Sequence, residues 1–312
     1  MAPRLHSFTT RQHMIKRTYE VYHYRDLYLN EVALHHHDFY ELYLFLSGDV
    51  DYNIESRIYH VTPGDILLIS PNELHQPMFG SDQQTYERIV VWIDKAYLRQ
   101  TANFGPCLAR CFDQAAERHT NLLRPDGNTV QILTALLEQG MEAADGEKFA
   151  GELFSDTCLL QMLGILNRLA ERTSQNPEIR DKSGSVVAQV LGYNNEHYSE
   201  DLSLDLLANK FFISKYHLSR EFNRLVGTSV YRYIIQKRLV MAKQMLGEGV
   251  PSSEVYQHCA FGDYSNFYRA FKAEYQISPK EYVVKLKQDA EEASARAKER
   301  GSLMNAMQIP AE

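Results

Sequence analysis

Residues 206–278 carry one pattern twice, with the second copy displaced by 49 positions. Apolar residues coincide with apolar residues in the two copies, and an arginine coincides with an arginine. The matched pairs are Leu206 with Val255, Phe212 with Phe261, Leu218 with Phe267, Arg220 with Arg269, Phe222 with Phe271, and Ser229 with Ser278. Self-similarity at a fixed spacing indicates one structural unit that is used twice.

Each copy predicts a helix, a tight turn and a second helix. In the first copy, "SLDLLANKF" supplies an amphipathic segment, and Ser214 is placed to cap the following helix, "KYHLSREFNRL". Leu218, Phe222 and Leu225 lie on one stripe of that second helix, because residues three or four apart share a face. This apolar stripe requires burial, so the opposite face of the helix is predicted to point outward.

The two outward faces carry side chains with which proteins read DNA. Arginine pairs with guanine, hydroxyl groups contact bases or phosphates, and aromatic rings meet thymine methyl groups. We therefore predict two recognition helices, the second capped by Asp263. The predicted DNA contacts are Tyr216, His217, Ser219 and Arg220 in the first copy and Tyr264, Ser265, Tyr268 and Arg269 in the second.

The segment between the two copies, "SVYRYIIQKRLVMAKQMLGE" at 229–248, predicts a helix of about 20 residues, or ~30 Å. This length is close to the ~34 Å of one DNA turn, so the two recognition helices are expected to enter successive major grooves. Lys237, Arg238 and Lys243 on or near this helix are predicted phosphate contacts. The alternative is a plain helical bundle whose exposed Arg and Tyr side chains are only solvated.

The net charge of −7 gives no sign of nucleic acid binding, but its distribution does. Residues 185–287 hold 13 Lys and Arg against 10 Asp and Glu, whereas the remainder holds 20 against 30. An acidic body joined to a mildly basic module suggests a DNA-contacting protein. The sequence has no apolar run near the ~20 residues of a membrane span, no secretory signal and no disulfide-type cysteine spacing, so we expect a cytoplasmic protein.

The N-terminal part predicts a different architecture. Short runs rich in Tyr, Val, Ile and Phe, such as "ELYLFLS", "DYNIES" and "DILLIS", are separated by turn signals and indicate antiparallel strands. From about residue 127 the spacing changes to that of amphipathic helices. We expect an α+β multidomain fold. Its parts are a barrel at 1–126, a helical hairpin at 127–173, a polar linker at 174–185, an all-α double helix-turn-helix domain at 186–287, and a charged, partly disordered tail at 288–312.

Residues 186–285 resemble the DNA-binding region of the AraC/XylS family of transcriptional regulators over essentially its whole length. The resemblance is carried by "LSREFNRLVGTSVYRYI", "KRLVMAKQML", "FGDYSNFYRAFK" and "ISPKEY". It implies that the two outward faces named above belong to recognition helices. The family has Gly-Phe in the second turn, where this chain has Ala260-Phe261. If that position needs a positive φ, alanine costs about 1 kcal/mol there.

The run "HHHDFYELYLFLSG" at 35–48 resembles a cupin barrel, and "TPGD" and "PNELH" extend the resemblance. His35 and His37 share one face of a strand because side chains alternate with a period of two. In metal-binding cupins the residues at these positions are the ligands of a divalent metal. The resemblance therefore implies that His35, His37, Glu41 and His75 are candidate metal ligands in this chain. The alternative, which we favour, is a polar pocket lining or a hydrogen-bonded cluster that needs no cofactor.

We expect the barrel to sense a small polar effector, such as a sugar or a related metabolite. The predicted effector-binding residues are Tyr24, His35, His37, Glu41, Tyr43, His75 and Trp92, with Arg4 and His6 as further candidates. The sequence offers no separate nucleophile or acid–base pair, so we expect a regulator and not an enzyme. The alternative is a metal-dependent cupin enzyme, a dioxygenase or isomerase, with an attached helical module.

The expected partners are double-stranded DNA, the effector and RNA polymerase. The helices at 127–172, and "LLQMLGILNRL" in particular, present more apolar surface than a lone hairpin hides. This surface either packs within the chain or pairs with a second copy. In the second case a homodimer places four helix-turn-helix units on paired half-sites.

Overall fold

A computed structural model of the chain describes residues 5–6, 13–29, 31–55, 57–80, 85–100, 107–144, 149–173, 186–288 and 291. By their internal contacts the residues form two compact units. The first consists of residues 1–192 and 216–228, and the second of residues 193–215 and 229–312. The predicted linker at 174–185 and nearly all of the charged tail lie outside the described residues.

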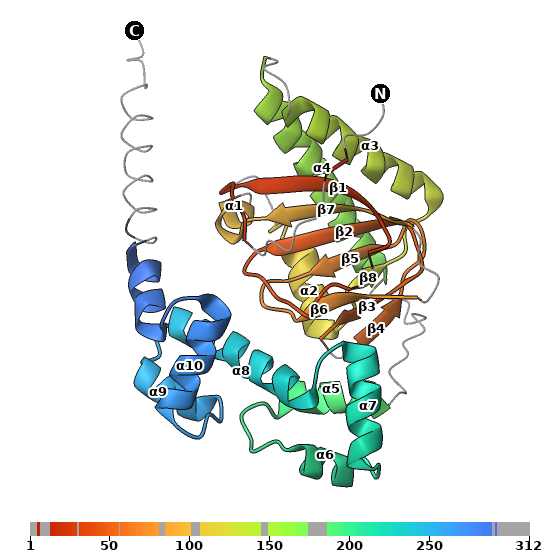
Figure 1. Cartoon of the computed structure of the whole chain (residues 1–312). Helices are drawn as coiled ribbons and strands as arrows, with labels where there is room; N and C mark the ends of the chain where they lie inside the picture. Colours follow the sequence, from red (N-terminus) through yellow and green to blue (C-terminus); the bar gives the residue numbers. More distant parts are fainter. Residues whose placement is uncertain are drawn as a thin grey trace. The chain divides into compact units, whose positions relative to one another are not determined.

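Two antiparallel β-sheets form the centre of the first unit (Figure 1). The strands are β1 (Tyr19–Leu27), β2 (Tyr40–Ser47), β3 (Val50–Ile54), β4 (Arg57–His60), β5 (Ile66–Ile69), β6 (His75–Phe79), β7 (Thr85–Ile93) and β8 (Leu122–Leu123). One sheet has the order β1-β7-β2-β5-β8, and the other has the order β4-β3-β6. The prediction of antiparallel strands in the N-terminal part is confirmed.

Strand β2 shows how the sequence fills two cores at once. Its side chains alternate between the two faces of the five-stranded sheet, and both faces are buried along most of the strand. Tyr43 and Phe45 belong to the core between the two sheets. Leu42 and Leu44 belong to the core between the five-stranded sheet and the helices that cover it. Burial on both faces explains why "ELYLFL" is an almost continuous apolar run.

The helices that cover the five-stranded sheet follow strand β7 in the chain (Figure 1). They are α1 (Lys95–Gln100), α2 (Arg110–Arg118), α3 (Gly127–Ala144) and α4 (Gly151–Thr173). The apolar stripe of α4, which includes Leu159, Met162 and Leu166, is buried in the same core as the outer face of the sheet. This part of "LLQMLGILNRL" therefore packs within the chain. Among the described residues, no helix is both long and apolar enough to cross a membrane.

The remaining elements are helical. They are α5 (Val186–Glu196), α6 (Leu204–Lys210), α7 (Lys215–Val226), α8 (Val230–Gly247), α9 (Ser252–His258) and α10 (Tyr264–Tyr275). Helix α7 belongs to the first unit, whereas α6, α8, α9 and α10 belong to the second. A core with Leu239, Val255, Phe261, Phe267 and Phe271 joins α8, α9 and α10.

The predicted repeat holds for the second helix of each copy. Helices α7 and α10 begin 49 residues apart, at Lys215 and Tyr264. The side chains predicted to be buried on them, Leu218 and Phe222 on α7 and Phe267 and Phe271 on α10, are each 0% exposed. The predicted cap is confirmed on α10, because the Asp263 side chain accepts a hydrogen bond from the Asn266 backbone N–H.

In the first helix of each copy the predicted register is wrong by one residue. Leu207, and not Leu206, is the buried counterpart of Val255, because Leu207 and Val255 are both 0% exposed while Leu206 is 39% exposed. The extra residue lies in the turn. The turn residue with positive φ is Phe212 in the first copy and Ala260 in the second. Two residues separate Phe212 from α7, and three separate Ala260 from α10.

The pairing of Phe212 with Phe261 is therefore wrong. Phe261 follows the positive-φ residue and is buried at 7% exposure, whereas Phe212 is itself that residue and is 94% exposed. The alanine of the second turn does have a positive φ, since Ala260 has φ 52°, and Phe212 in the first turn has φ 54°. Both turns thus place a side chain in a region that favours glycine.

Candidate functional site

Three histidines beside the core between the sheets are oriented by the main chain. Because a carbonyl oxygen only accepts hydrogen bonds, the ring Nδ1 that faces it carries the proton, and Nε2 faces the neighbouring side chains. The Nδ1–oxygen distances are 2.8 Å from His35 to Ala33, 2.9 Å from His37 to Phe39, and 2.8 Å from His75 to Glu73. All three predicted histidines are thus brought together.

Glu41 lies between His37 and Trp92. Its Oε2 accepts a hydrogen bond of 2.8 Å from the Trp92 indole N–H and lies 3.0 Å from Nε2 of His37. Burial by itself would raise the pKa of Glu41, but the hydrogen bond and charge of His37 lower that pKa below its usual value. The site therefore contains a buried, hydrogen-bonded carboxylate.

His75 has an unused acceptor at the centre of this cluster. The residue is 0% exposed, and its Nε2 has no hydrogen-bond partner among the described residues. Its ring centroid lies 4.3 Å from that of His35, 4.8 Å from that of His37 and 6.4 Å from that of Tyr52. Burial, followed by the neighbouring histidines, lowers the pKa of His75 well below its usual value. A neutral ring leaves the Nε2 lone pair available to a hydroxyl or N–H donor.

The same atoms suit a metal ion. One ligand atom from each of His37, Glu41 and His75 lies within 4.8 Å of the others. Two imidazoles and a carboxylate fit a divalent Fe, Mn, Zn or Ni ion, and hydrogen bonds from Nδ1 to carbonyl oxygens commonly orient metal-binding histidines. The fourth implied ligand, His35, is not part of this group. Three of the four implied ligands therefore lie within reach of one ion.

The other predicted effector residues line the same core. Trp92 joins the histidine cluster through Glu41. The Tyr43 hydroxyl donates a hydrogen bond of 2.6 Å to the Tyr86 hydroxyl, and the Tyr43 ring lies 5.0 Å from that of Tyr52. Tyr52 and Tyr86 were not predicted, although the inward face of each strand follows from the period of two.

Tyr24 belongs to a second group, centred on a residue that the sequence reasoning missed. Arg88 is 3% exposed and forms an ion pair with Asp26. Its guanidinium carbon lies 4.7 Å from the centroid of the Tyr24 ring and 4.1 Å from that of Tyr86. Counting back by twos from Trp92 along β7 places Arg88 on the inward face, and this signal could have found it.

His6 pairs with β1, and its ring lies 6.4 Å from that of Tyr24. Arg4 lies outside the described residues. The His6 ring also lies 5.4 Å from that of Tyr22, so His6 is placed beside β1.

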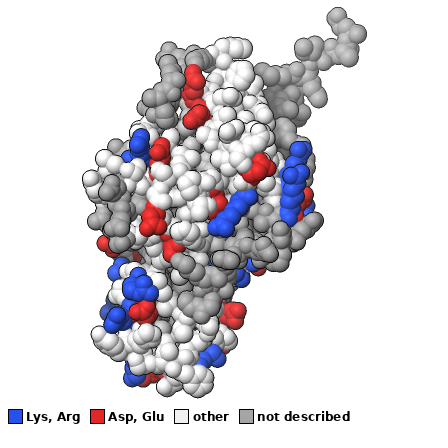
Figure 2. Space-filling model, turned by 90° about the vertical axis from the view of Figure 1, so that its right-hand side faces the viewer, with Lys and Arg blue, Asp and Glu red and all other residues white. Residues whose placement is uncertain are grey.

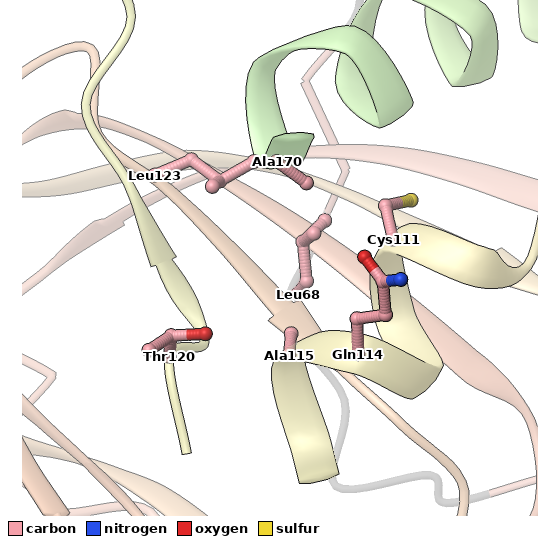
Figure 3. Close-up of a pocket in the computed structure, with 7 residues that line it drawn as sticks. All are labelled: Leu68, Cys111, Gln114, Ala115, Thr120, Leu123 and Ala170. Carbon is pink, nitrogen blue, oxygen red and sulfur yellow. The ribbon is translucent and has the colours of Figure 1, made fainter. Parts of the chain in front are cut away.

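Cavities in the described part of the chain lie outside the core between the sheets, and one of them, of about 10 Å³, lies between Val21, Leu137 and Met162. Another, also of about 10 Å³, is lined by residues of β5, β8, α2 and α4 that include Leu68, Cys111 and Leu123 (Figure 3). Each has room for no more than one water molecule. A third, of about 240 Å³, runs along β1 and is lined by Tyr19, Met141 and Ser155 among others. Of these three, only the cavity along β1 is large enough to be a rival effector site.

Helices α7 and α10 expose most of the predicted DNA contacts. On α7, Tyr216 is 76% exposed, and His217, Ser219 and Arg220 are also exposed. On α10, Tyr264 is 38% exposed, Ser265 and Arg269 are exposed, and Tyr268 is half-buried. The buried stripes lie on the opposite face of each helix. The space-filling view in Figure 2 shows Lys and Arg side chains interspersed with Asp and Glu over one face of the molecule.

Arg238 is the exception among the predicted DNA contacts, and its assignment to a phosphate was wrong. Its side chain is buried, and its guanidinium donates to three main-chain carbonyl oxygens. The distances are 2.9 Å from Nε to Tyr198, 2.7 Å from Nη2 to Glu200 and 2.9 Å from Nη1 to Ala260. With its donors turned inward, Arg238 connects α8 to the segment after α5 and to the second turn.

The other two predicted phosphate contacts remain partly accessible. Lys237 is half-buried. The Lys243 ammonium lies 5.0 Å from the centroid of the Tyr275 ring and 5.8 Å from that of Tyr282. Lys243 therefore covers aromatic surface of the second unit as well as presenting charge.

Comparison with known proteins gives two family matches. Residues 18–163 match the AraC-like ligand binding domain, and residues 207–284 match the helix-turn-helix domain. The HTH-type transcriptional activator RhaS of Salmonella schwarzengrund (strain CVM19633) is 22% identical over 248 residues, which cover 79% of this chain and 86% of RhaS. RhaS of Escherichia coli O157:H7 (strain EC4115 / EHEC) is 23% identical with the same coverage. The crystal structure of ToxT from Vibrio cholerae O395 is 13% identical, covers 87% of this chain and 99% of ToxT, and has a TM-score of 0.35.

Proposed function

Because this chain belongs to the AraC family of transcriptional regulators, we propose that it reads specific DNA sequences through α7 and α10 and responds to a small polar effector bound between its two sheets. It is a regulator and not an enzyme. The observation that carries the effector site is the unused Nε2 of His75, whose ring is buried beside those of His35, His37 and Tyr52. A buried acceptor without a partner is costly, and a ligand donor removes that cost.

The chemistry of the cluster favours a hydroxylated ligand such as a sugar. His75 offers an acceptor, Glu41 offers a carboxylate, and Trp92 offers an aromatic face for the apolar side of a sugar ring. We propose that the bound effector raises transcription, and the name of the RhaS relatives, transcriptional activator, supports this sign.

The proposed partners follow from the same reading. An activator acts with RNA polymerase in the cytoplasm, where bacterial DNA is found. We also propose a homodimer. Phe149 is 97% exposed, and Leu153 and Phe154 are each 62% exposed, so the start of α4 presents apolar surface that a second copy would cover.

The effector proposal is tested by a thermal-shift screen with sugars and other hydroxylated metabolites. A ligand at 100 times its Kd stabilises the folded state by about 2.7 kcal/mol and raises the Tm accordingly. Two variants then locate the hit. His75→Phe removes the acceptor and should abolish the shift, whereas Met141→Trp fills the cavity along β1 and should leave it intact. If Met141→Trp abolished the shift and His75→Phe left it intact, the effector would bind in the cavity along β1 and not in the histidine cluster.

A metal ion in the cluster is a separate candidate that the approach of His37, Glu41 and His75 supports. Metal analysis of the purified protein tests it, with His37→Ala as the variant that should lose the ion. A stoichiometric ion that His37→Ala removes would make the metal part of the effector site. Equal metal content in both proteins would remove the metal from the proposal.

A further inference from the structure

Strand β6 connects the proposed effector site to helix α7. His75 and Gln76 are consecutive in β6, so their side chains point to opposite faces of the strand. His75 contacts the histidine cluster on one face. On the other face Gln76 is 4% exposed, and its Nε2 donates a hydrogen bond of 2.8 Å to the carbonyl oxygen of Val226. Val226 is the last residue of α7.

We infer that this hydrogen bond, the Gln76 clasp, holds α7 on the three-stranded sheet and that effector binding at His75 opens it. The inference rests on the proposed function for its ligand. It adds the route by which that ligand reaches a recognition helix.

The end of α7 is well suited to be held in this way. The last carbonyl groups of a helix have no partner within the helix and are satisfied from outside. Gly227 ends α7 with φ +65°, a conformation that L residues rarely adopt. A β carbon at Gly227 would lie 3.6 Å from Nε2 of Gln76, which shows how closely the chain passes the amide. The clasp therefore joins a fixed helix end to a fixed strand.

Asn53 makes the closed clasp easy to open. It lies opposite Gln76 on the neighbouring strand β3 and so shares its face of the sheet. Asn53 is 0% exposed, yet neither its Nδ2 nor its Oδ1 has a hydrogen-bond partner among the described residues. A buried amide without partners is unfavourable relative to one in water. In the closed state the amide of Gln76 makes a favourable hydrogen bond, while the amide of Asn53 is buried without partners among the described residues. Opening exposes the Asn53 amide to water, with which it can form hydrogen bonds.

The burial of this face is concentrated where α7 is held. Asn53 and Gln76 are buried, whereas Asp51 and Met78, which face each other two residues further along the same strands, are half-buried. Residues 216–228 belong to the same compact unit as the sheet. The segment that contains α7 is therefore the natural cover for the two amides.

The route from His75 to the clasp is one peptide long. Consecutive Cα atoms are about 3.8 Å apart, so a displacement of His75 moves Gln76 as well. His75 is also tied to His35 by two backbone hydrogen bonds, with N–O distances of 2.9 Å and 3.1 Å. The core around His75 is closely packed, so a ligand that enters it has to displace β6. The effector then favours the state in which β6 has moved and the clasp is open.

The state in which the clasp is open favours DNA binding. A regulator that reads one duplex with α7 and α10 needs both helices to move together. In the closed state α7 belongs to the first unit, while α10 belongs to the second. Release of α7 removes that restraint, so the closed clasp lowers DNA affinity.

Two substitutions of matched size should move DNA affinity in opposite directions. Gln76→Met removes the donor at nearly constant volume, and Asn53→Leu removes the unsatisfied amide. The probe is a duplex that the wild-type chain selects from a random-sequence pool, measured without effector. We expect Gln76→Met to bind it about three- to tenfold more tightly and Asn53→Leu to bind it weaker by a similar factor, given the free energy of a single hydrogen bond. Gln131→Met, on the exposed surface of α3, is the control and should change nothing.

Hydrogen exchange provides a readout that needs no DNA. The amides of α7 should exchange faster in Gln76→Met and more slowly in Asn53→Leu than in the wild type, while those of α10 stay unchanged. Urea denaturation shows which variants are folded. If Gln76→Met is not, Gln76→Glu replaces it, because a carboxylate cannot donate to the Val226 carbonyl.

The clasp would be overturned if the two folded variants changed DNA affinity in the same direction as each other, if they changed the exchange of α7 in the same direction as each other, or if neither variant changed either quantity. The effector arm is separate. If no metabolite binds the barrel, the proposed function fails, but the two effector-free measurements still decide the clasp. If a metabolite binds and raises the DNA affinity of Gln76→Met as much as that of the wild type, the effector site stands and the coupling is wrong.

Discussion

The two copies of the helix-turn-helix repeat are alike inside and different in their attachments. Both α7 and α10 bury two residues four apart and expose an arginine and a tyrosine on the opposite face. Helix α10 shares one core with α8 and α9, and the turn before it is tied to α8 by Arg238. Helix α7 belongs to the unit that contains the sheets, and its last carbonyl is bound by Gln76.

A repeated sequence therefore predicts the fold of each copy but not the part of the molecule to which the copy is attached. The second copy is built into a self-contained helical unit. The first copy is shared between units, and this makes it the copy through which a signal from the sheets can act. Four predictions test how far the two copies differ.

The largest effect should come from Arg238, which ties the turn of the second copy to α8. Arg238→Ala leaves three carbonyl oxygens without their donors and should lower the free energy of unfolding by about 3–5 kcal/mol. Urea denaturation followed by circular dichroism measures the loss. Lys237→Ala, next to it on α8 and half-buried, is the control and should cost less than about 0.5 kcal/mol. Equal losses in the two variants would mean that Arg238 does not anchor the turn.

The next effect concerns DNA reading by both copies. Arg220→Ala on α7 and Arg269→Ala on α10 should each weaken specific binding by about 1–3 kcal/mol, because each removes a contact to a base edge. Titration of a selected duplex and of a scrambled duplex measures the specific part. Arg224→Ala is the control, since Arg224 lies closer to Glu221 than Arg220 does, with N–O distances of 2.8 Å and 3.9 Å. A loss for Arg269 alone would show that only the second copy reads bases.

A smaller effect should distinguish the two turns from ordinary helix positions. Ala260→Gly and Phe212→Gly each relieve a positive φ and should raise the free energy of unfolding by about 1 kcal/mol. Phe212 is almost fully exposed, so no burial is lost with its side chain. Ala273→Gly, on the exposed face of α10, should instead lower stability by about 1 kcal/mol. Thermal or urea unfolding that gives all three substitutions the same sign would contradict the strain at the turns.

The smallest effect belongs to the helix between the copies. Lys237→Ala should weaken binding to all sequences alike, because a phosphate contact carries no base information. The slope of log affinity against log salt concentration should fall by about one. Binding titrations at several salt concentrations measure both quantities, with Gln244→Ala as an uncharged control on the same helix. An unchanged slope would remove Lys237 from the interface.

The periodic parts of the sequence predicted most of the fold. Alternating apolar residues between turn signals indicated the strands, and i, i+3, i+4 spacing indicated α3, α4, α7 and α10. The error in the repeat had a local cause. One additional residue in the second turn shifts the first helix by one position, and an offset of 49 that fits α7 and α10 then misaligns Leu206 and Phe212. A single spacing cannot describe two segments joined by turns of unequal length.

The sequence predicted only those residues of the candidate site whose side chains form a recognisable pattern. Three histidines and a glutamate stand out in the sequence, and the structure brings them together. Arg238 and Gln76 bind main-chain oxygen atoms, which every residue has, so no sequence pattern identifies their partners. Gln76 and Val226 are also separated by 150 positions, far beyond the reach of any local periodicity. The alternation of side chains along β7 also places Arg88 on the inward face, but burial was not predicted for it because arginine is rarely buried.

The way Arg238 is held has a consequence for how this molecule tolerates substitution. Its acceptors are the carbonyl groups of Tyr198, Glu200 and Ala260, and these groups persist whatever side chains those positions carry. Mutation can therefore alter all three positions without erasing an acceptor, while position 238 itself has little freedom. A screen of random variants should find tolerance at the three and intolerance at the one.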